Sequence, residues 1–290
     1  MANQNIREIP DENRLRILLS QGGEFVSLVQ QTIELNNLPF TVEQVGDKFV
    51  LKDKLQGSAL HLKQFITVDP TMMKRKEDVH ALAKCEYPVL ITGETGTGKE
   101  IIANALKGDR TGLTVFINCA GLPETLMESE LFGYVKGSFT GAMGDRQGML
   151  ARAKGGLAFL DEISWLTLPM QAKLLRAIQN KTVRRVGGFE EEPIDCKIVC
   201  ATNKSLDGLV RQGLFLPDLY ARISTFEFNI TPIRERMCDV EPIIRSMKMG
   251  EMFLNALRAS GKNLHNLSFP HNVRSIEQYV RRFEVLRRID

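Results

Sequence analysis

The chain has few of the features that mark membrane and secreted proteins. Its 290 residues contain no apolar run approaching the roughly 20 residues that span a bilayer. The first residues lack the apolar segment of a signal peptide. The five cysteines are scattered and include no C-x-x-C pair, which argues against a disulfide framework and against a metal site. These absences predict a cytoplasmic protein with reduced thiols and no membrane partner.

The chain also lacks a large excess of charge of either sign. Its 38 basic and 35 acidic residues leave a net charge of +3, so composition alone is only weak evidence for nucleic-acid binding. The contents of hydrophobic residues (43%) and charged residues (25%) are those of an ordinary globular protein. The length is sufficient for a full α/β core with one or two small additions.

One glycine-rich segment carries the strongest functional signal. It follows the apolar run at residues 88–92 and precedes a helical pattern that begins at Ile101. A strand, a G-x-x-x-x-G-K loop and a helix in this order form the context in which backbone N–H groups surround nucleotide phosphates. The predicted phosphate-binding residues are Gly93, Glu94, Thr95, Gly96, Thr97, Gly98, Lys99 and Glu100. Lys99 is expected to reach the β- and γ-phosphates, whereas Glu100 stands where Ser or Thr usually binds magnesium.

Two more predicted strands end in polar residues. Residues 156–161 run into Asp161-Glu162, and residues 196–201 lead to Asn203. We predict that Asp161 holds Mg²⁺ and that Glu162 orients and deprotonates the attacking water. Asn203 is expected to sense the γ-phosphate or to position the water.

A further motif occupies residues 128–142, with the sequence Glu-Ser-Glu-Leu-Phe-Gly-Tyr-Val-Lys-Gly-Ser-Phe-Thr-Gly-Ala. Together with the glutamate in the eighth position of the glycine loop, it resembles the AAA+ ATPases of bacterial enhancer-binding proteins, which activate sigma-54 RNA polymerase. The family pattern is GAFTGA, and this chain has GSFTGA. The resemblance covers about residues 66–285 and includes the segments 115–120, 174–179, 185–188, 201–203, 232–236 and 272–274.

The resemblance implies an α/β fold, an AAA+ P-loop ATPase with a parallel sheet flanked by helices and a small C-terminal helical lid. It implies ATP and Mg²⁺ as cofactors. It gives Asn118 the role of pairing with the catalytic glutamate, and it makes Asn203 the first sensor. Arg274 would be the second sensor, reaching from the lid toward the γ-phosphate.

The resemblance also implies that subunits share their ATP sites. Residues 215–222 correspond to the family's F-R-x-D-L-x-x-R, in which two arginines project into the neighbouring subunit. Arg222 matches the second arginine, and Leu216 replaces the first. A site completed in trans implies a ring or an open spiral, in this family a homo-hexamer. His271 stands where the family has glycine, which puts the lid geometry in question.

The pattern along the chain predicts three parts. Residues 1–65 form a small N-terminal α+β segment with a regulatory or interaction role, residues 66–230 the AAA+ α/β domain, and residues 231–290 the lid. Residues 11–36 show helical periodicity interrupted at Gly22-Gly23, and residues 41–51 predict a β-hairpin. The α/β domain is expected to have strands at 88–92, 114–118, 156–161 and 196–201, and helices from near Lys99, Leu122, Pro169 and Leu206. We interpret the end at Asp290 as leaving no room for a C-terminal helix-turn-helix domain.

Two functions remain open on the sequence alone. The predicted target-contact loop consists of Gly137, Ser138, Phe139, Thr140, Gly141 and Ala142. In the leading interpretation this loop engages sigma-54 RNA polymerase holoenzyme, and ATP hydrolysis opens the closed promoter complex. In the alternative, the chain is a DNA helicase or translocase motor on the same fold, of phage origin, with DNA in a central pore. The pore would then be lined by Lys136, Lys181, Arg184 and Arg185.

Overall fold

The computed structural model describes residues 25–35, 40–45, 48–53, 61–121 and 123–288. The chain forms two compact units, Met1–Gln56 and Gly57–Asp290. In the first unit, helix α2 (Val26–Leu35) precedes a hairpin of β1 (Phe40–Val45) and β2 (Lys48–Asp53), which pair antiparallel. The predicted hairpin is therefore confirmed, and α2 lies inside the predicted helical segment. The part of that segment before residue 25 lies outside the described residues.

The second unit contains a parallel five-stranded sheet with the order β11-β3-β10-β7-β4. The four predicted strands are confirmed, and their bounds are β3 (Val89–Gly93), β4 (Thr114–Asn118), β7 (Gly156–Asp161) and β10 (Cys196–Thr202). The fifth strand, β11 (Phe226–Ile230), was not predicted from the sequence. It lies at the sheet edge, where Phe226, Glu227 and Asn229 are exposed, and polar residues interrupt its apolar ones.

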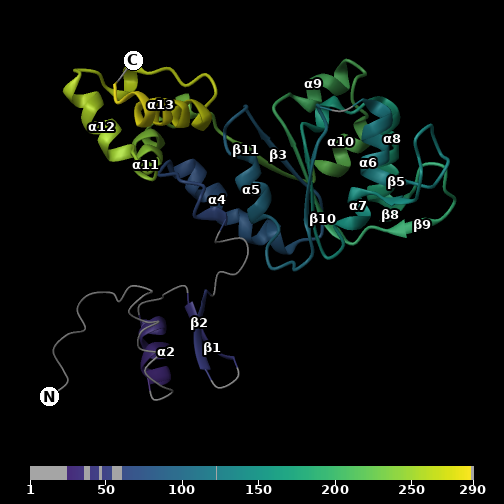
Figure 1. Cartoon of the computed structure of the whole chain (residues 1–290), viewed down its shortest axis with the longest axis horizontal. Helices are drawn as coiled ribbons and strands as arrows, with labels where there is room; N and C mark the ends of the chain where they lie inside the picture. The colour runs from purple at the N-terminus through teal and green to yellow at the C-terminus, as the bar shows by residue number, and fades with distance from the viewer. Residues whose placement is uncertain (1–24, 36–39, 46–47, 54–60, 122, 289–290) are drawn as a thin grey trace. The chain divides into compact units, whose positions relative to one another are not determined.

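The side chains of the sheet divide between two cores because successive residues of a strand point to opposite faces. In β7, Leu157 and Phe159 face one core, whereas Ala158 and Leu160 face the other. The first face is covered by α4 (Pro70–Lys84) and α5 (Lys99–Ala105). The second is covered by α6 (Glu124–Phe132), α7 (Met149–Arg152), α8 (Leu168–Asn180), α9 (Leu206–Arg211) and α10 (Pro217–Ile223), as Figure 1 shows. The helices predicted near residues 99, 122, 169 and 206 are thus present.

Two short hairpins extend from the second face. One consists of β5 (Gly133–Tyr134) and β6 (Arg146–Gln147), and the other of β8 (Thr182–Arg184) and β9 (Glu191–Pro193). Tyr134 also forms a β-bridge with Val186, so the first hairpin is joined to the loop between β8 and β9. The predicted target-contact loop lies between β5 and β6.

The chain continues from β11 into a helical region with a core of its own. Its helices are α11 (Val240–Arg245), α12 (Gly250–Ala259) and α13 (Val273–Leu286). Phe253 and Phe283 meet edge to face in this core, with ring centroids 5.7 Å apart. The three-part division at residues 65 and 230 stays a prediction. Within the described part of the chain, no helix is long and apolar enough to cross a membrane.

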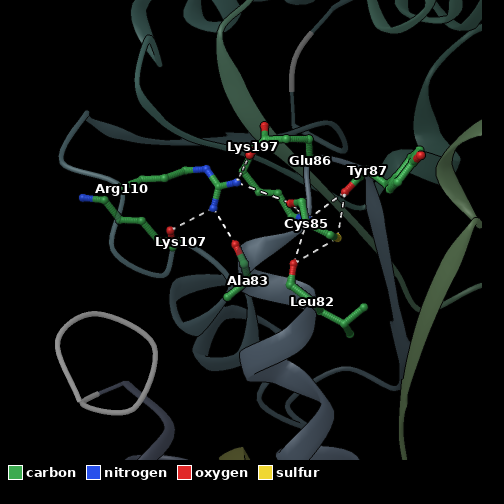
Figure 2. A network of polar contacts seen from close by, with 8 residues as sticks. All are labelled: Leu82, Ala83, Cys85, Glu86, Tyr87, Lys107, Arg110 and Lys197. Carbon is green, nitrogen blue, oxygen red and sulfur yellow. Dashed lines mark hydrogen bonds and ion pairs between the residues drawn. The ribbon is translucent and has the colours of Figure 1, made fainter. Parts of the chain in front are cut away.

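A buried lysine fixes the end of α4 to the start of β10. Lys197 is fully buried, and its ammonium donates to three backbone carbonyls at 2.7–2.9 Å, those of Leu82, Cys85 and Tyr87 (Figure 2). The Cys85 sulfur lies 3.2 Å from the same nitrogen. Burial lowers the pKa of Lys197. The last carbonyls of a helix have no partner within the helix and carry partial negative charge, so a cation is well placed there.

Arg110 adds a second cation at the same helix end. Its guanidinium donates to the Ala83 carbonyl at 2.6 Å and to the Glu86 carboxylate at 2.6 Å, as Figure 2 also shows. This network lies at the amino ends of the strands, whereas the predicted nucleotide site lies at their carboxyl ends. Its role is therefore to hold α4 on the sheet.

Replacing Lys197 by methionine keeps an unbranched side chain that is one atom shorter and removes the ammonium. We expect Lys197→Met to lower the free energy of unfolding by about 2 kcal/mol, because buried carbonyls lose their donors. Urea unfolding measures this change, with Lys197→Arg as the variant that keeps a cation. Equal stability of the methionine variant and the parent protein would contradict the assigned role.

Candidate nucleotide-binding site

The glycine loop, residues 93–99, joins β3 to α5. Lys99 is the first residue of α5 and is only 8% exposed. Its Nζ donates to the carbonyl oxygens of Gly93 at 3.0 Å and Glu94 at 3.3 Å, so the ammonium lies inside the loop. Burial lowers the pKa of Lys99, and the negative charges of Glu162 and Asp161 oppose that shift. The structure thus places Lys99 close to Glu162 and Asp161, and their roles toward a nucleotide stay predictions.

Glu162 occupies an unusual backbone position at the end of β7. It has φ 54° and ψ 45°, the left-handed region that non-glycine residues adopt at a cost. One carboxylate oxygen, Oε1, lies 3.9 Å from Lys99 Nζ. The other, Oε2, is buried and has no hydrogen-bond partner among the described residues. A strained residue that holds an unpaired buried oxygen is typical of a site that binds or activates a ligand.

The donor set is suited to a hard cation held jointly with a phosphate. Asp161 is half-buried, and its Oδ1 accepts from the backbone N–H of Glu162 at 3.0 Å. The carboxylate oxygens of these two residues are the kind of ligand that Mg²⁺ prefers. In the part of the chain that the structure describes, no group of three or more His, Cys, Asp or Glu side chains could hold a metal ion. A magnesium ion here would therefore depend on phosphate and water for its remaining ligands.

Two asparagines lie at neighbouring strand ends. Asn203 follows β10, and its Nδ2 donates to Thr95 Oγ1 at 3.2 Å, so it contacts the glycine loop, and its role as a sensor stays a prediction. Asn118 ends β4 opposite Asp161. Its Oδ1 accepts from the backbone N–H of Ala120 at 2.9 Å. The pairing of Asn118 with Glu162 stays a prediction.

The turn before α13 lies directly on the glycine loop. Val273 N donates to the Gly96 carbonyl at 3.0 Å. A Cβ atom at Gly96 would lie 2.2 Å from the carbonyl oxygen of His271, so only glycine permits this approach. Arg274 is exposed, and its charge contributes to the lowered pKa of Lys99. The lid thus brings Arg274 to the predicted site.

Asn272 connects the glycine loop to the lid. It is 1% exposed and has φ 54° and ψ −129°, which is unfavourable for any residue with a Cβ. Its Nδ2 donates to Thr95 O at 3.0 Å and to Glu94 Oε2 at 3.2 Å. Its Oδ1 accepts from Ile233 N at 2.7 Å. One amide therefore ties together the glycine loop, the segment that enters the lid and the start of α13.

The side chain of Glu94 faces the lid. Both of its carboxylate oxygens accept from Arg234, at 2.7 and 2.8 Å. These hydrogen bonds, followed by that from Asn272, hold the pKa of Glu94 below its ordinary value. Glu94 therefore contributes a lid contact through its side chain, in addition to its backbone position in the loop.

The predicted target-contact loop is closed by a hydrogen bond from Gly137 N to Ala142 O at 2.9 Å. Thr140 is exposed at its tip. Phe139 is only 42% exposed, because its ring packs edge-on to Tyr134 with centroids 5.0 Å apart. The hydroxyl of Ser138 is buried and has no partner among the described residues. The change from the family's alanine to Ser138 thus introduces an unsatisfied polar group.

The basic residues of the adjacent hairpin are paired with acidic ones. Arg184 lies 3.1 Å from Glu191, and Arg185 forms an ion pair with Glu192. Arg185 also lies 4.0 Å from Asp145, beyond the target-contact loop. Two of the four cations predicted to line a DNA pore therefore form ion pairs within the chain.

Comparison with known proteins identifies the family. Residues 65–229 match the family described as the sigma-54 interaction domain. The response regulator PilR of Pseudomonas aeruginosa is 44% identical over 223 residues, which cover 73% of this chain and 50% of PilR. The chain belongs to the sigma-54 interaction domain family. The family consists of AAA+ ATPases, so the predicted enzyme class is confirmed at that level.

Further similarities agree with this assignment. The anaerobic nitric oxide reductase transcription regulator NorR of Vibrio vulnificus is 37% identical over 296 residues, covering 99% of this chain and 54% of NorR. The chain thus spans about half the length of these curated relatives. The crystal structure of NtrX from Brucella abortus in complex with ATP superposes with a TM-score of 0.64 at 27% identity, covering 79% of this chain and 55% of NtrX. These findings confirm the predicted α/β AAA+ fold.

The residues expected to act between subunits of a sigma-54 activator lie apart from the glycine loop. Arg222 is in the last turn of α10, exposed, and forms no ion pair with any described residue. Leu216 packs against the core of the second face, and its N–H donates to Gln171 Oε1 at 2.7 Å. Leu216 therefore has a packing role here, which leaves Arg222 as the candidate trans arginine.

One buried ion pair of this chain was not predicted from the sequence. Arg236 and Asp239 are 2% and 0% exposed, and a hydrogen bond of 2.9 Å joins them. Asp239 also accepts from Thr67 Oγ1 at 2.7 Å and from Val68 N at 2.6 Å, and Arg236 donates to Thr97 O at 3.4 Å. The pair connects the segment before α4 to the glycine loop. In the sequence, this pair was indicated by Arg236, which ends segment 232–236, one of the segments that resemble the family.

Two substitutions at Asn272 distinguish the effect of losing its side-chain amide from the effect of its backbone conformation. Asn272→Gly and Asn272→Ala both remove the amide, and we expect each to weaken ADP binding about tenfold because the glycine loop loses its anchors. The backbone conformation at this position is unfavourable for alanine but not for glycine. The free energy of unfolding of Asn272→Ala should therefore be about 1 kcal/mol lower than that of Asn272→Gly.

Fluorescent-ADP titration and urea unfolding measure the two effects. Lys181→Gly changes another residue with positive φ (54°) and serves as the control for backbone freedom, with unchanged ADP affinity. Parental ADP affinity in Asn272→Gly would show that the amide does not hold the loop.

Proposed function

We propose that the chain is an ATP-hydrolysing ring ATPase that remodels sigma-54 RNA polymerase closed complexes to activate transcription in the cytoplasm. The observation that carries this proposal is the exposed tip of the loop at residues 137–142, with Thr140 at the surface, inside a sigma-54 interaction domain. The names of relatives support it, since PilR is a response regulator and NorR a transcription regulator.

The site supports hydrolysis by the chain's own residues. Lys99 and the backbone of the glycine loop would hold the phosphates, and Asp161 would hold magnesium. Magnesium would neutralise charge on the phosphates when bound. The unpaired Oε2 of Glu162 is available to orient a water and accept its proton. Asn203 and Arg274 would sense the γ-phosphate from the sheet and from the lid.

The alternative, a motor that grips DNA, is less well supported. Lysines and arginines bind nucleic acid by replacing the counterions of its phosphates, and an arginine that already has a carboxylate partner gains less from this exchange. Arg184 and Arg185 are paired with Glu191 and Glu192.

The deciding experiment traps the chain on its target with ADP–aluminium fluoride. Labelled sigma-54 and labelled forked DNA are offered separately in a native-gel assay. We expect a complex with sigma-54 that Thr140→Ala reduces at least tenfold and that Thr140→Ser, which keeps the hydroxyl, retains. A complex with forked DNA alone would replace this proposal with the motor.

A second test concerns the shared site. Arg222→Ala alone should lose roughly 10³-fold in ATPase rate, because a trans arginine stabilises charge on the transferred group. A Lys99→Ala subunit cannot hold the phosphates in its own site but still supplies Arg222 to the neighbouring subunit's site. Mixing the two inactive variants should restore part of the ATPase, with a maximum near equal amounts. Absence of recovery at every ratio would argue against a homo-hexamer with sites completed in trans.

A further inference from the structure

The only tryptophan of the chain, Trp165, lies at the surface beside the predicted catalytic residues. It ends the short 3-10 helix η2 (Ile163–Trp165), which follows Glu162, and it is 55% exposed. The ammonium of Lys204 lies 3.9 Å from the centroid of its ring. Lys204 in turn follows Asn203, the predicted sensor. One cation–π contact therefore joins the segments that carry Glu162 and Asn203.

This contact lies beyond the point where β7 and β10 stop pairing. The last paired residues of the two strands are Leu160 and Cys200, after which the first strand leaves the sheet. In the described part of the chain, no backbone hydrogen bond joins residues 162–165 to residues 200–204. Side chains have to make the connection there, and the cation–π contact is one of them.

The backbone on both sides of the contact is held in place. Trp165 N donates to Glu162 O at 3.0 Å, so the turn closes on the predicted catalytic residue. Lys204 N donates to Thr202 Oγ1 at 3.0 Å, and Thr202 is fully buried. The contact between the two side chains therefore acts on the ends of the strands themselves.

Glu162 needs such support because its backbone is strained. With φ 54° it lies in the left-handed region, which a non-glycine residue keeps only where its surroundings fix it. Its backbone hydrogen bonds, to Asp161 Oδ1 and from Trp165 N, are made with near neighbours in the chain. These neighbours would move together with it. The contact of Trp165 with Lys204 reaches the next strand end and holds the turn relative to Asn203.

We propose that Trp165 and Lys204 are positioning residues for ATP hydrolysis, which hold the Glu162 carboxylate in place relative to Asn203. The proposal rests on the hydrolysis proposed above. The pair lies outside the glycine loop, so it should act on the rate of hydrolysis and leave nucleotide affinity unchanged. An exposed cation–π contact changes an equilibrium about two- to fivefold, which sets the size of the expected effect.

A double-mutant cycle in the full chain tests the pair. Trp165→Leu and Lys204→Met each remove one partner of the contact and keep an apolar side chain. We expect each to lower kcat about threefold, with KM and ADP affinity changed by less than about twofold. Because both changes break the same contact, the double variant should lose no more than either single variant. Lys204→Arg keeps a cation over the ring and should retain the parental kcat.

The single tryptophan provides a second readout. Lys204 covers one face of its ring, so acrylamide should quench the fluorescence of Lys204→Met more strongly than that of the parent chain. Lys154→Met is the matched control. Lys154 is an exposed lysine just before the opposite end of β7, so its removal should change neither the quenching nor kcat. Thermal unfolding midpoints show whether each variant is folded.

The outcomes separate this inference from the function on which it rests. Parental kcat in both single variants, or effects that add fully in the double variant, would refute the pair while the ATPase function stands. A loss in Trp165→Leu that Lys204→Met does not share would mean that the tryptophan acts through another contact, which also refutes the pair. An equal fall in ADP affinity and kcat would show a structural role in place of a positioning one. If the parent chain hydrolyses no ATP, the proposed function itself fails.

Discussion

The buried amide of Asn272 is the interaction on which the arrangement of this site depends. The glycine loop has flexible backbone, and its conformation is fixed from outside by the lid. The same amide accepts from Ile233 N, so the segment that leaves the sheet and the helix that carries Arg274 share one anchor. The position of the lid and the shape of the loop are consequently coupled. A change in one requires breaking hydrogen bonds that are shielded from water, where their loss is costly.

Much of the fold follows from local patterns, and the contacts that complete the site do not. The apolar runs that became β3, β7 and β10 are buried on both faces, so each is continuous and easy to recognise. The edge strand β11 alternates and gives a weaker signal. The residues of the site were predicted because motifs place them at strand ends. Asn272 and Asp239 act through partners more than 150 residues away, and a single sequence contains no pattern that reports such pairs.

The target-contact surface shows a related limit. A phenylalanine between glycines predicts an exposed apolar tip, and Phe139 is 42% exposed although Tyr134, five residues earlier, packs edge-on against its ring. Likewise, a small-for-small replacement at Ser138 looks neutral in the sequence. The structure shows that the hydroxyl is enclosed without a partner. Which basic residues are free for phosphates also depends on register, because the pairing of β8 with β9 sets Arg184 opposite Glu191. Contacts across loops decide these properties, and composition does not.

Helix α4 is held at both ends by buried charge. At its start, the backbone N–H groups of Val68 and Asp69 bind Asp239, and at its end Lys197 binds the last carbonyls. In mechanical terms the helix is fixed at both ends. It cannot shift along its axis or rotate unless the hydrogen bonds of one of the two charged groups break. Its 15 residues span about 22 Å. The segment that enters the lid and the amino end of the central strand β10 are therefore linked across that distance through one helix.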